Sequence, residues 1–339
     1  MSSNAEYLRS HLVRPSGRSP PPAASSPSPR PPERTPVIRA LPGAAALAAA
    51  LLLLTGCASG ASAGGEAAAA KYSDLAQGST CSALREQHPD WVGKTLTNAI
   101  NPHTPGYESV NADDPSVYEG FDIDLGEAMG ACLGFTVDYV PVAFAELIPT
   151  MASGQADFVI SDIYATEERA ANADFITYSK VFDGLLVAKG NPKQLTGIDT
   201  SLCGTTVALN KGFVEVPLVE ALASDCEAAG KAAPTVSLFD GNADCVQAIL
   251  AGRADTYIND VNTVNRFIQE HPDDLDKATA VTLDYKIGIA VPQERTDFRD
   301  AMEAALVAVQ DSGLQQQLAA DWDLDENAVE APTILSTTD

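Results

Sequence analysis

Residues 120–179 decide the fold, and they read GFDIDLGEAMGACLGFTVDYVPVAFAELIPTMASGQADFVISDIYATEERAANADFITYS. A helical pattern ends at Gly134, and residues 135–139 then alternate between apolar and polar side chains, which is typical of a half-buried strand. A second helical pattern over residues 144–153 leads into the short apolar run 158–160. Helices and strands that alternate across short turns predict parallel α/β units.

The next helix is expected to begin at Thr166, and its first turn carries an unusual charge. Thr166 suits the N-cap position, and Glu167 and Glu168 suit the positive end of the helix dipole. Arg169 does not, but a cation beside unsatisfied backbone N–H groups forms a site for a small anion. The alternative is a surface arginine that pairs with Glu167 or Glu168, and this turn alone leaves both open.

A short motif occurs twice. MASGQADFVISD at residues 151–162 aligns with ILAGRADTYIND at residues 249–260. We therefore expect two similar α/β lobes, in which Asp162 and Asp260 follow equivalent buried strands. Open parallel sheets bind ligands beyond the carboxyl ends of their strands, so the two aspartates and Arg169 are expected to line a cleft.

Seven motifs follow one another in order between about residues 92 and 322. Together they resemble the polar-amino-acid-binding family of ABC-transporter solute-binding proteins (extracellular solute-binding proteins, family 3). The resemblance implies an α/β fold of the periplasmic-binding-protein type II class, in which two Rossmann-like lobes enclose a ligand cleft and are joined by a two-crossover hinge. The motifs are GFDIDL (120–125), FAELIP (144–149), GQAD (154–157), TEERA (166–170), GRAD (252–255), ND (259–260) and IGIAV (287–291).

The resemblance also implies roles for three side chains. Arg169 would hold the α-carboxylate of the ligand, Asp260 would take its α-ammonium group, and Phe144 would stack on its side chain. A bidentate guanidinium suits a carboxylate, and a buried carboxylate needs a cation. Asp260 is alternatively the N-cap of the following helix, and it can serve both purposes. Phe144 is alternatively a core residue.

Five further positions are expected near the ligand, because they carry polar or aromatic groups where the resemblance places the cleft. Relatives often have Gly or Ser where this chain has Asp162, and Ser or Thr where it has Tyr164. Binders of basic amino acids tend to have Asp where this chain has Asn101. Tyr107 lies near the position of an aromatic residue in the first loop, and Phe213 replaces a small residue of the second lobe.

Two classes of ligand remain open on these residues. One is a polar or basic amino acid whose distal cation pairs with Asp162, although Asn101 argues against it. The other is a modified or quaternary-ammonium solute held by cation–π contacts with Phe144, Tyr164 and Phe213. The sequence slightly favours the first.

The N-terminal segment has the features of a leader. The apolar run 40–54 follows Arg39, is short for a membrane span and suits a signal peptide. It ends in Leu54-Thr55-Gly56-Cys57, which resembles a bacterial lipobox and implies lipidation of Cys57; an ordinary signal peptide is the alternative. The length of the segment before this run suggests that residues 1–36 come from a misassigned start codon.

We divide the chain into a leader, two lobes and short flanking segments. Lobe 1 is expected to contain two stretches of chain, because the sequence returns to it after lobe 2. The proposed ranges are 1–56 for the leader, 57–90 for a flexible tether and lead-in, 91–187 plus 284–325 for lobe 1, 188–283 for lobe 2 and 326–339 for a C-terminal tail. Residues 298–322 are expected to form one long amphipathic helix.

The cysteines suggest an exported protein rather than a metal site. No C-x-x-C pair occurs and the four histidines are scattered, so we expect neither a structural metal nor another cofactor. Export permits disulfides, and Cys203–Cys226 is the first choice of pair because the two residues flank one strand–helix segment. Cys81–Cys132 is a second choice, which leaves Cys245 free.

The charge of the chain excludes one class of partner. Residues 1–56 hold six arginines and two acidic residues, so the remainder has a formal charge of −29, against −25 for the whole chain. Nucleic acids and anionic lipid surfaces are poor partners for such a protein.

Together these features predict a membrane-anchored solute-binding protein of an ABC importer, outside the cell membrane. Its partners would be a small zwitterion, a permease and an ATPase; it would touch the membrane only through its lipid, and a monomer is the default. A dehydratase-like enzyme on the same fold, with Asp162 as general acid, is one alternative. A ligand-sensing module is another. No catalytic residue is predicted.

Overall fold

The computed structural model describes residues 70–337, without the side chains of Asp284 and Glu326. The predicted leader, the lipidation site Cys57 and the tether up to residue 69 lie outside the described residues. Two short helices begin the described part, and they pack against the first long helix of lobe 1. They are α2 (Ser73–Gln77) and α3 (Ser79–Gln87), followed by a 3-10 turn, η1 (Pro89–Trp91).

Lobe 1 is built on parallel strands, as predicted. Strand β1 pairs in parallel with β5 on one side and with β6 on the other. A small antiparallel sheet of β2, β3 and β4 is inserted after β1. The bounds are β1 (Thr95–Ile100), β2 (His103–Thr104), β3 (Glu108–Val110), β4 (Tyr118–Glu119), α4 (Phe121–Leu133), β5 (Thr136–Pro141), η2 (Phe144–Glu146), α5 (Leu147–Ala152), β6 (Phe158–Val159), β7 (Tyr164–Ala165) and α6 (Glu167–Ala170).

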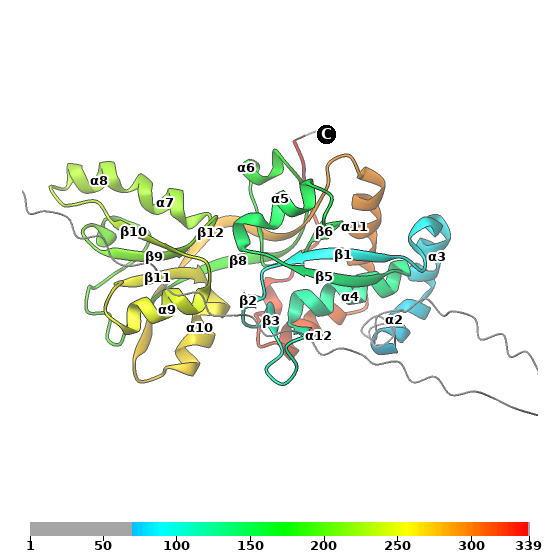
Figure 1. Cartoon of the computed structure of the whole chain (residues 1–339), viewed down its shortest axis with the longest axis horizontal. Helices are drawn as coiled ribbons and strands as arrows, with labels where there is room; N and C mark the ends of the chain where they lie inside the picture. Colours follow the sequence, from blue (N-terminus) through cyan, green and yellow to red (C-terminus); the bar gives the residue numbers. More distant parts are fainter. Residues whose placement is uncertain (1–69, 338–339) are drawn as a thin grey trace, which may run out of the picture. The chain divides into compact units, whose positions relative to one another are not determined.

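Lobe 2 repeats this arrangement. Strand β9 pairs in parallel with β10 and β11, and helices cover both faces of the strands (Figure 1). The bounds are η3 (Thr200–Leu202), β9 (Thr206–Asn210), α7 (Glu215–Ala221), α8 (Ala223–Ala228), β10 (Thr235–Phe239), α9 (Asn242–Leu250), β11 (Thr256–Asp260) and α10 (Val261–Glu270).

Two long antiparallel strands connect the lobes. Strand β8 (Asp174–Ala188) leads out of lobe 1, and β12 (Leu275–Val291) returns to it. Because β8 pairs with β11 of lobe 2, β12 pairs with β6 of lobe 1, and β8 and β12 pair with each other, the sheet runs in the order β10-β9-β11-β8-β12-β6-β1-β5. The predicted boundary at residue 283 therefore falls inside β12. The α/β class with two crossovers is confirmed.

Each lobe buries a hydrophobic cluster on both faces of its strands, because neighbouring side chains in a strand point to opposite faces. In β9, Ala208 packs with α9 and α10, whereas Val207 and Leu209 pack with α7 and α8. In lobe 1, Val159 packs towards α5, whereas Phe158 and Ile160 pack towards α4 and α11. The continuous apolar runs of these strands thus reflect burial on both sides.

The sequence repeat has one backbone structure in both lobes. Gly154 and Gly252 have φ angles of 76° and 66°, which suit glycine after a helix. The next aspartates then bind the first strand of their lobe in the same way. Asp157 Oδ2 accepts from Thr97 N at 2.9 Å, and Asp255 Oδ2 accepts from Thr206 N at 2.8 Å. The repeat is therefore structural.

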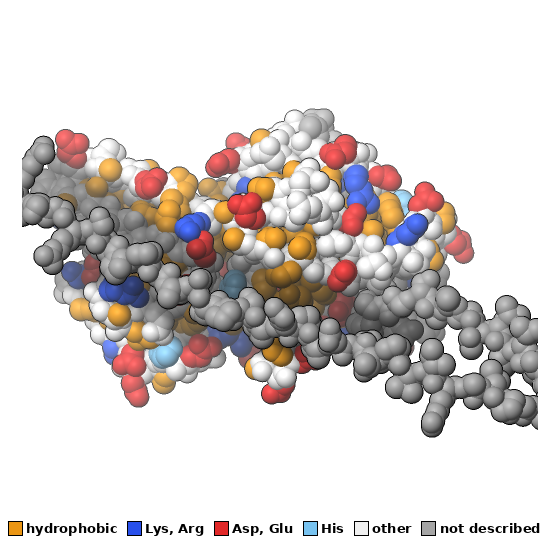
Figure 2. Space-filling model, viewed as in Figure 1, with side chains coloured by type: hydrophobic (Ala, Val, Ile, Leu, Met, Phe, Trp, Pro, Cys, Tyr) orange, Lys and Arg blue, Asp and Glu red, His pale blue; other side chains and the backbone are white. Residues whose placement is uncertain are grey.

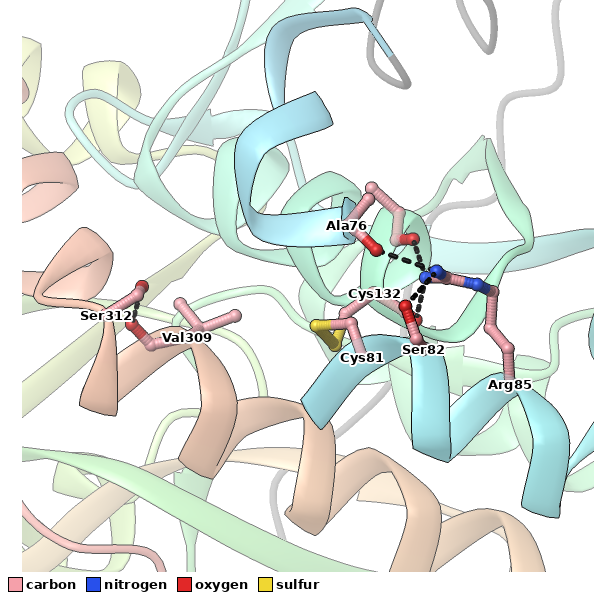
Figure 3. The surroundings of a disulfide bond; sticks show 8 residues. Ala76, Cys81, Ser82, Arg85, Cys132, Val309 and Ser312 are labelled. Atoms are coloured by element: carbon pink, nitrogen blue, oxygen red, sulfur yellow. Dashed lines mark hydrogen bonds between the residues drawn. A yellow bond between two sulfur atoms is a disulfide. The ribbon is translucent and has the colours of Figure 1, made fainter. Parts of the chain in front are cut away.

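Two disulfides join segments that are distant in sequence. Cys81 in α3 is bonded to Cys132 in α4, and Arg85 in α3 donates to Cys132 O at 2.9 Å and to Ala76 O at 2.7 Å (Figure 3). These contacts hold the N-terminal helices on lobe 1. In lobe 2 the disulfide joins Cys203 and Cys226. Cys245 is buried and free in α9.

The predicted long helix at residues 298–322 is wrong in one respect. The structure has α11 (Thr296–Asp311) and α12 (Leu314–Asp321), separated at Gly313, whose φ of 77° is incompatible with a continuous right-handed helix. The expected tail also has structure, because η4 (Glu326–Ala328) is followed by β13 (Ile334–Leu335), which pairs with β8. Among the helices of residues 70–337, none is both long and apolar enough to span a membrane.

Candidate ligand-binding site

A narrow pocket lies between the lobes, with about 200 Å³ of empty space when the part open to solvent is included. Lobe 1 contributes residues from η2, from the segment after β6 and from α6. Lobe 2 contributes the loop between β9 and α7 and the end of β11. The lining residues are Phe144, Asp162, Tyr164 and Arg169 of lobe 1, and Phe213, Val214, Glu215 and Asn259 of lobe 2. Acidic side chains elsewhere are scattered over the face drawn in Figure 2.

Arg169 is held in place by neutral oxygens. Thr166 caps α6 as predicted, accepting from Arg169 N at 3.1 Å. The guanidinium donates to Tyr164 O at 2.7 Å and, across the cleft, to Gly212 O at 2.9 Å. Burial lowers the pKa of Arg169, and Glu215 is the acid with the largest opposing effect. Arg169 has no salt bridge within residues 70–337, so local pairing with Glu167 or Glu168 is not what the structure shows.

Two aromatic rings close the cavity beside this arginine. The rings of Phe144 and Phe213 meet edge to face, with centroids 4.6 Å apart. The Arg169 guanidinium lies 5.3 Å from the Phe144 centroid, within the range of a cation–π contact. Phe144 is partly buried, packs against the α5 cluster and also lines the cavity.

Asp260 ends β11 and caps α10. Its Oδ1 accepts from Asn262 N at 2.8 Å and from Thr263 N at 3.4 Å, so the N-cap role is present. The residue is 1 % exposed. Burial raises the pKa of its carboxyl group to about 7, and the charge of Asp183 acts in the same direction.

Asp162 adopts an unusual backbone conformation, with φ of 40°. Aspartate tolerates this region better than most residues, although glycine fits it without strain. Asp162 N donates to Asp122 Oδ2 at 2.6 Å, and Asp162 Oδ1 is buried without a hydrogen-bond partner in the described part of the chain. Burial, followed by the charge of Asp260, raises the pKa of Asp162 well above its ordinary value.

Tyr164 contacts Asp183, and Asp183 interacts with Glu215; the sequence analysis missed both acids. The Tyr164 hydroxyl donates to Asp183 Oδ1 at 3.0 Å, and the charge of Glu215 helps to raise the pKa of Asp183, after burial. Asp183 is fully buried in β8 and Glu215 is 1 % exposed at the start of α7. A visible signal for Asp183 was an acid inside the apolar segment Val181-Phe182-Asp183-Gly184-Leu185. No motif pointed to Glu215.

Of the predicted ligand-binding residues, Asn101, Tyr107 and Asp260 do not line the cavity. Asn101 Nδ2 donates to Val142 O at 2.8 Å, and the residue lines a separate pocket together with Asp240. Tyr107 is buried beside the site: its hydroxyl accepts from Asn262 Nδ2 at 3.3 Å. Burial, then the charges of Asp260 and Asp162, raises the pKa of Tyr107.

Two further buried acids, Asp122 and Glu108, lie near Asp162 and form a second layer of acids around the site. Asp122 Oδ1 accepts from Tyr178 OH at 2.7 Å, and Glu108 Oε1 accepts from Ser161 Oγ at 2.9 Å. Burial raises the pKa of Asp122 to about 6, and raises that of Glu108 well above its usual range. One sequence feature could have indicated Asp122: it is an acidic residue in the apolar first turn of the helix that begins with Gly120-Phe121-Asp122.

The site is thus a pocket between two α/β lobes, lined by one guanidinium, two carboxyl groups and three aromatic rings. Within residues 70–337, no cluster of His, Cys, Asp and Glu is arranged to hold a metal ion. The fold and the cavity define a two-lobed ligand-binding protein.

Comparison with known proteins gives the family. Residues 96–325 match the bacterial extracellular solute-binding proteins, family 3, and the chain belongs to that family. The arginine-binding protein ArgT of Corynebacterium glutamicum is 27% identical over 241 residues, which cover 70% of this chain and 77% of that protein. The matched relatives are binding proteins, and the chain is a binding protein, not an enzyme.

Solved structures of the same fold agree. An ancestral arginine-binding protein bound to arginine has a TM-score of 0.62 and 24% identity, and the match covers 67% of this chain and 97% of that chain. A mutant of ArgBP from T. maritima has a TM-score of 0.58 and 26% identity, over 71% of this chain and 99% of that chain. The predicted periplasmic-binding-protein type II fold is confirmed.

Proposed function

We propose that this protein is the solute-binding component of an ABC importer, and that it captures an amino acid between its lobes and delivers it to a permease driven by an ATPase. The observation that carries this proposal is the position of Arg169. Its guanidinium is the one cation that lines a cavity otherwise bounded, within the described residues, by carboxyl groups, an amide and apolar side chains.

The ligand is an α-amino acid zwitterion. Its carboxylate pairs with Arg169, whose guanidinium forms no salt bridge within residues 70–337 and is oriented by Tyr164 O and Gly212 O. Its ammonium group lies at Asp260, where a positive charge would offset the burial that raises the carboxyl pKa to about 7. The rings of Phe144 and Phe213 enclose the rest of the ligand.

The relatives support an amino acid with a polar or cationic side chain. ArgT of C. glutamicum and a second relative in Escherichia coli are named as arginine-binding proteins, and one in Campylobacter jejuni as a probable histidine-binding protein. Asp162, whose Oδ1 has no partner among the described residues, suits such a ligand.

The protein works outside the cell membrane as a monomer. Cys57 carries the lipid anchor, because it follows an apolar run in a lipobox-like context. Each buried CH₂ of an acyl chain contributes about 0.8 kcal/mol, so more than one chain holds the protein stably.

Removal of the guanidinium tests this function. Arg169→Ala should weaken binding of L-arginine by roughly 100-fold or more, because a buried charge of the ligand loses its partner. Isothermal titration calorimetry measures the affinity, and circular dichroism confirms that the variant is folded. Arg253→Ala is the matched control, since Arg253 is exposed on lobe 2. Agmatine, which lacks the α-carboxylate, should bind the wild type weakly. Wild-type affinity in Arg169→Ala would contradict the proposal.

A further inference from the structure

We propose that the paired carboxyl groups of Asp183 and Glu215 form a subsite for a hydrogen-bonding cation on the ligand side chain. This inference rests on the proposed function, which supplies the ligand's α-carboxylate and α-ammonium contacts. It names the ligand class more narrowly, as an α-amino acid with a guanidinium or ammonium group at the end of its side chain.

One member of the pair, Glu215, lines the cavity, and the other, Asp183, accepts a hydrogen bond from the lining residue Tyr164. Asp183 lies opposite Asp260 in the antiparallel pairing of β8 and β11, so the two side chains share one face of the sheet. A cation at the pair would therefore lie on the same face of the sheet as the position proposed for the α-ammonium group.

The pair has unused hydrogen-bonding capacity. Asp183 Oδ2 and Glu215 Oε2 are both buried, and neither has a hydrogen-bond partner among the described residues. A buried polar atom without a partner costs about 1–3 kcal/mol. A planar guanidinium, or an ammonium group, can donate to both oxygens at once. A quaternary ammonium group cannot, because it has no N–H, so the two oxygens disfavour the quaternary-ammonium class of ligand.

The surrounding charge also requires a cation. The groups that face the pair are Tyr164 from β7, Arg169 from α6, Asp260 from β11 and Asp162 after β6. Arg169 is the only cation among them, and the proposed function uses it for the ligand carboxylate. Four carboxyl groups then face one α-ammonium group, so a further positive charge on the ligand is stabilising.

Without a ligand, protons take the place of that charge. Burial raises the pKa of Asp183 and of Glu215, and for Asp183 the charge of Glu215 adds to the effect. Two neighbouring buried carboxyl groups do not both ionise easily, so the pair retains a proton. A cationic side chain displaces this proton to solvent. Affinity should therefore rise with pH, because at low pH the proton competes with the ligand.

The lobes complete the subsite together. Tyr164 belongs to lobe 1, Glu215 to lobe 2, and Asp183 to the strand that connects them. The Tyr164 hydroxyl donates to Asp183 at 3.0 Å and so fixes one carboxylate oxygen, leaving the other for the ligand.

A pair of matched ligands tests the subsite. L-Citrulline has nearly the shape of L-arginine but a neutral side chain. Calorimetry should show that the wild type binds arginine roughly 100-fold more tightly than citrulline, and that Glu215→Gln lowers the affinity for arginine by roughly 10- to 100-fold with little change for citrulline. Titrations in buffers of different ionisation enthalpy should show proton release with arginine, and less release in the variant.

Two further variants make the result decisive. Glu220→Gln removes the same charge from the exposed side of the same helix and should leave both affinities unchanged. Asp183→Asn should have the same effect as Glu215→Gln. If Glu215→Gln does not fold, Asp183→Asn takes its place in the test. Equal binding of arginine and citrulline by the wild type would overturn the subsite, as would an equal loss of both ligands in the two variants. If the wild type binds no amino acid at all, the proposed function itself fails.

Discussion

Single residues carry the chemistry of this site, and their burial is unfavourable without a ligand. Asp162, Asp183, Glu215 and Asp260 are all less than a tenth exposed. Burial of a carboxyl group raises its pKa and favours the neutral form. Among the described residues that line the cavity, Arg169 alone supplies a positive charge. We infer that the empty site is partly protonated and that a cationic ligand restores the charges.

Asp162→Gly should change ligand preference more than stability. Glycine accepts a φ of 40° without strain, and the substitution removes a buried carboxyl oxygen that has no partner within residues 70–337. The melting temperature should therefore stay the same or rise, while the relative affinities for arginine, glutamine and lysine change.

Asp323→Gly is the control for this substitution. Asp323 also has a positive φ, of 57°, but its side chain is exposed. Asp323→Gly should raise the stability by up to about 1 kcal/mol, because it relieves backbone strain at a positive φ, and should leave every affinity unchanged. Identical affinities for all ligands in wild type and Asp162→Gly would show that Asp162 does not contact the ligand.

The sequence predicted the residues that stand in motifs and missed those placed by tertiary structure. Arg169, Phe144, Asp162, Tyr164 and Phe213 all line the cavity. Their motifs follow strands or begin helices, so the topology of the fold gives their position. The missed residues are Asp183 and Glu215. Asp183 lies within β8, a strand that crosses between the lobes, and Glu215 reaches the site because lobe 2 lies against lobe 1 there.

The loops and short helices that follow the strands hold the site residues at the interface between the two lobes. The loop between β9 and α7 approaches η2, so Phe213 reaches Phe144 and Gly212 O reaches Arg169. Gly212 has a φ of 82°, and a Cβ atom there would lie 3.0 Å from the Cβ atom of Ala145. Glycine is thus required both for the turn and for the close approach.

Gly212→Ala should weaken ligand binding through this contact. Gly230 is the control, because it has a φ of 68° but open space around its Cα atom. Both substitutions should cost about 1 kcal/mol of stability, since both place a Cβ atom at a positive φ. Only Gly212→Ala should also lower the affinity for arginine, because it separates the two loops. Calorimetry and thermal melting distinguish the two effects, and equal affinities in both variants would contradict closure at this contact.

Element boundaries were harder to predict than element types. The repeat at residues 151–162 and 249–260 gave both lobes correctly, since the same glycine and aspartate contacts recur in each. The pattern of residues 298–322 hid a break at Gly313, because apolar spacing continues across it. The pairing of β13 with β8 was also missed, because a strand of two residues has no periodicity to detect.

At the scale of the whole molecule, two crossing strands let the lobes form one continuous sheet while the ligand site stays between them. Strand β8 contributes Asp183 to this region, and β12 contributes the residues that pair with β7. A protein with two connections between its lobes can close on a ligand by bending at those strands. The disulfides, one in each lobe, leave this movement free.

The central claim is that the cavity holds an α-amino acid through both of its charged α groups. The most direct test is a thermal-shift measurement of the purified protein with the common amino acids, agmatine, citrulline and betaines. A ligand present at ~100 times its dissociation constant stabilises the folded state by about 2.7 kcal/mol, which gives a clear shift. We predict a shift with α-amino acids, largest with arginine or another basic amino acid, and little with agmatine. Stabilisation by betaines alone, or by no amino acid, would contradict this account.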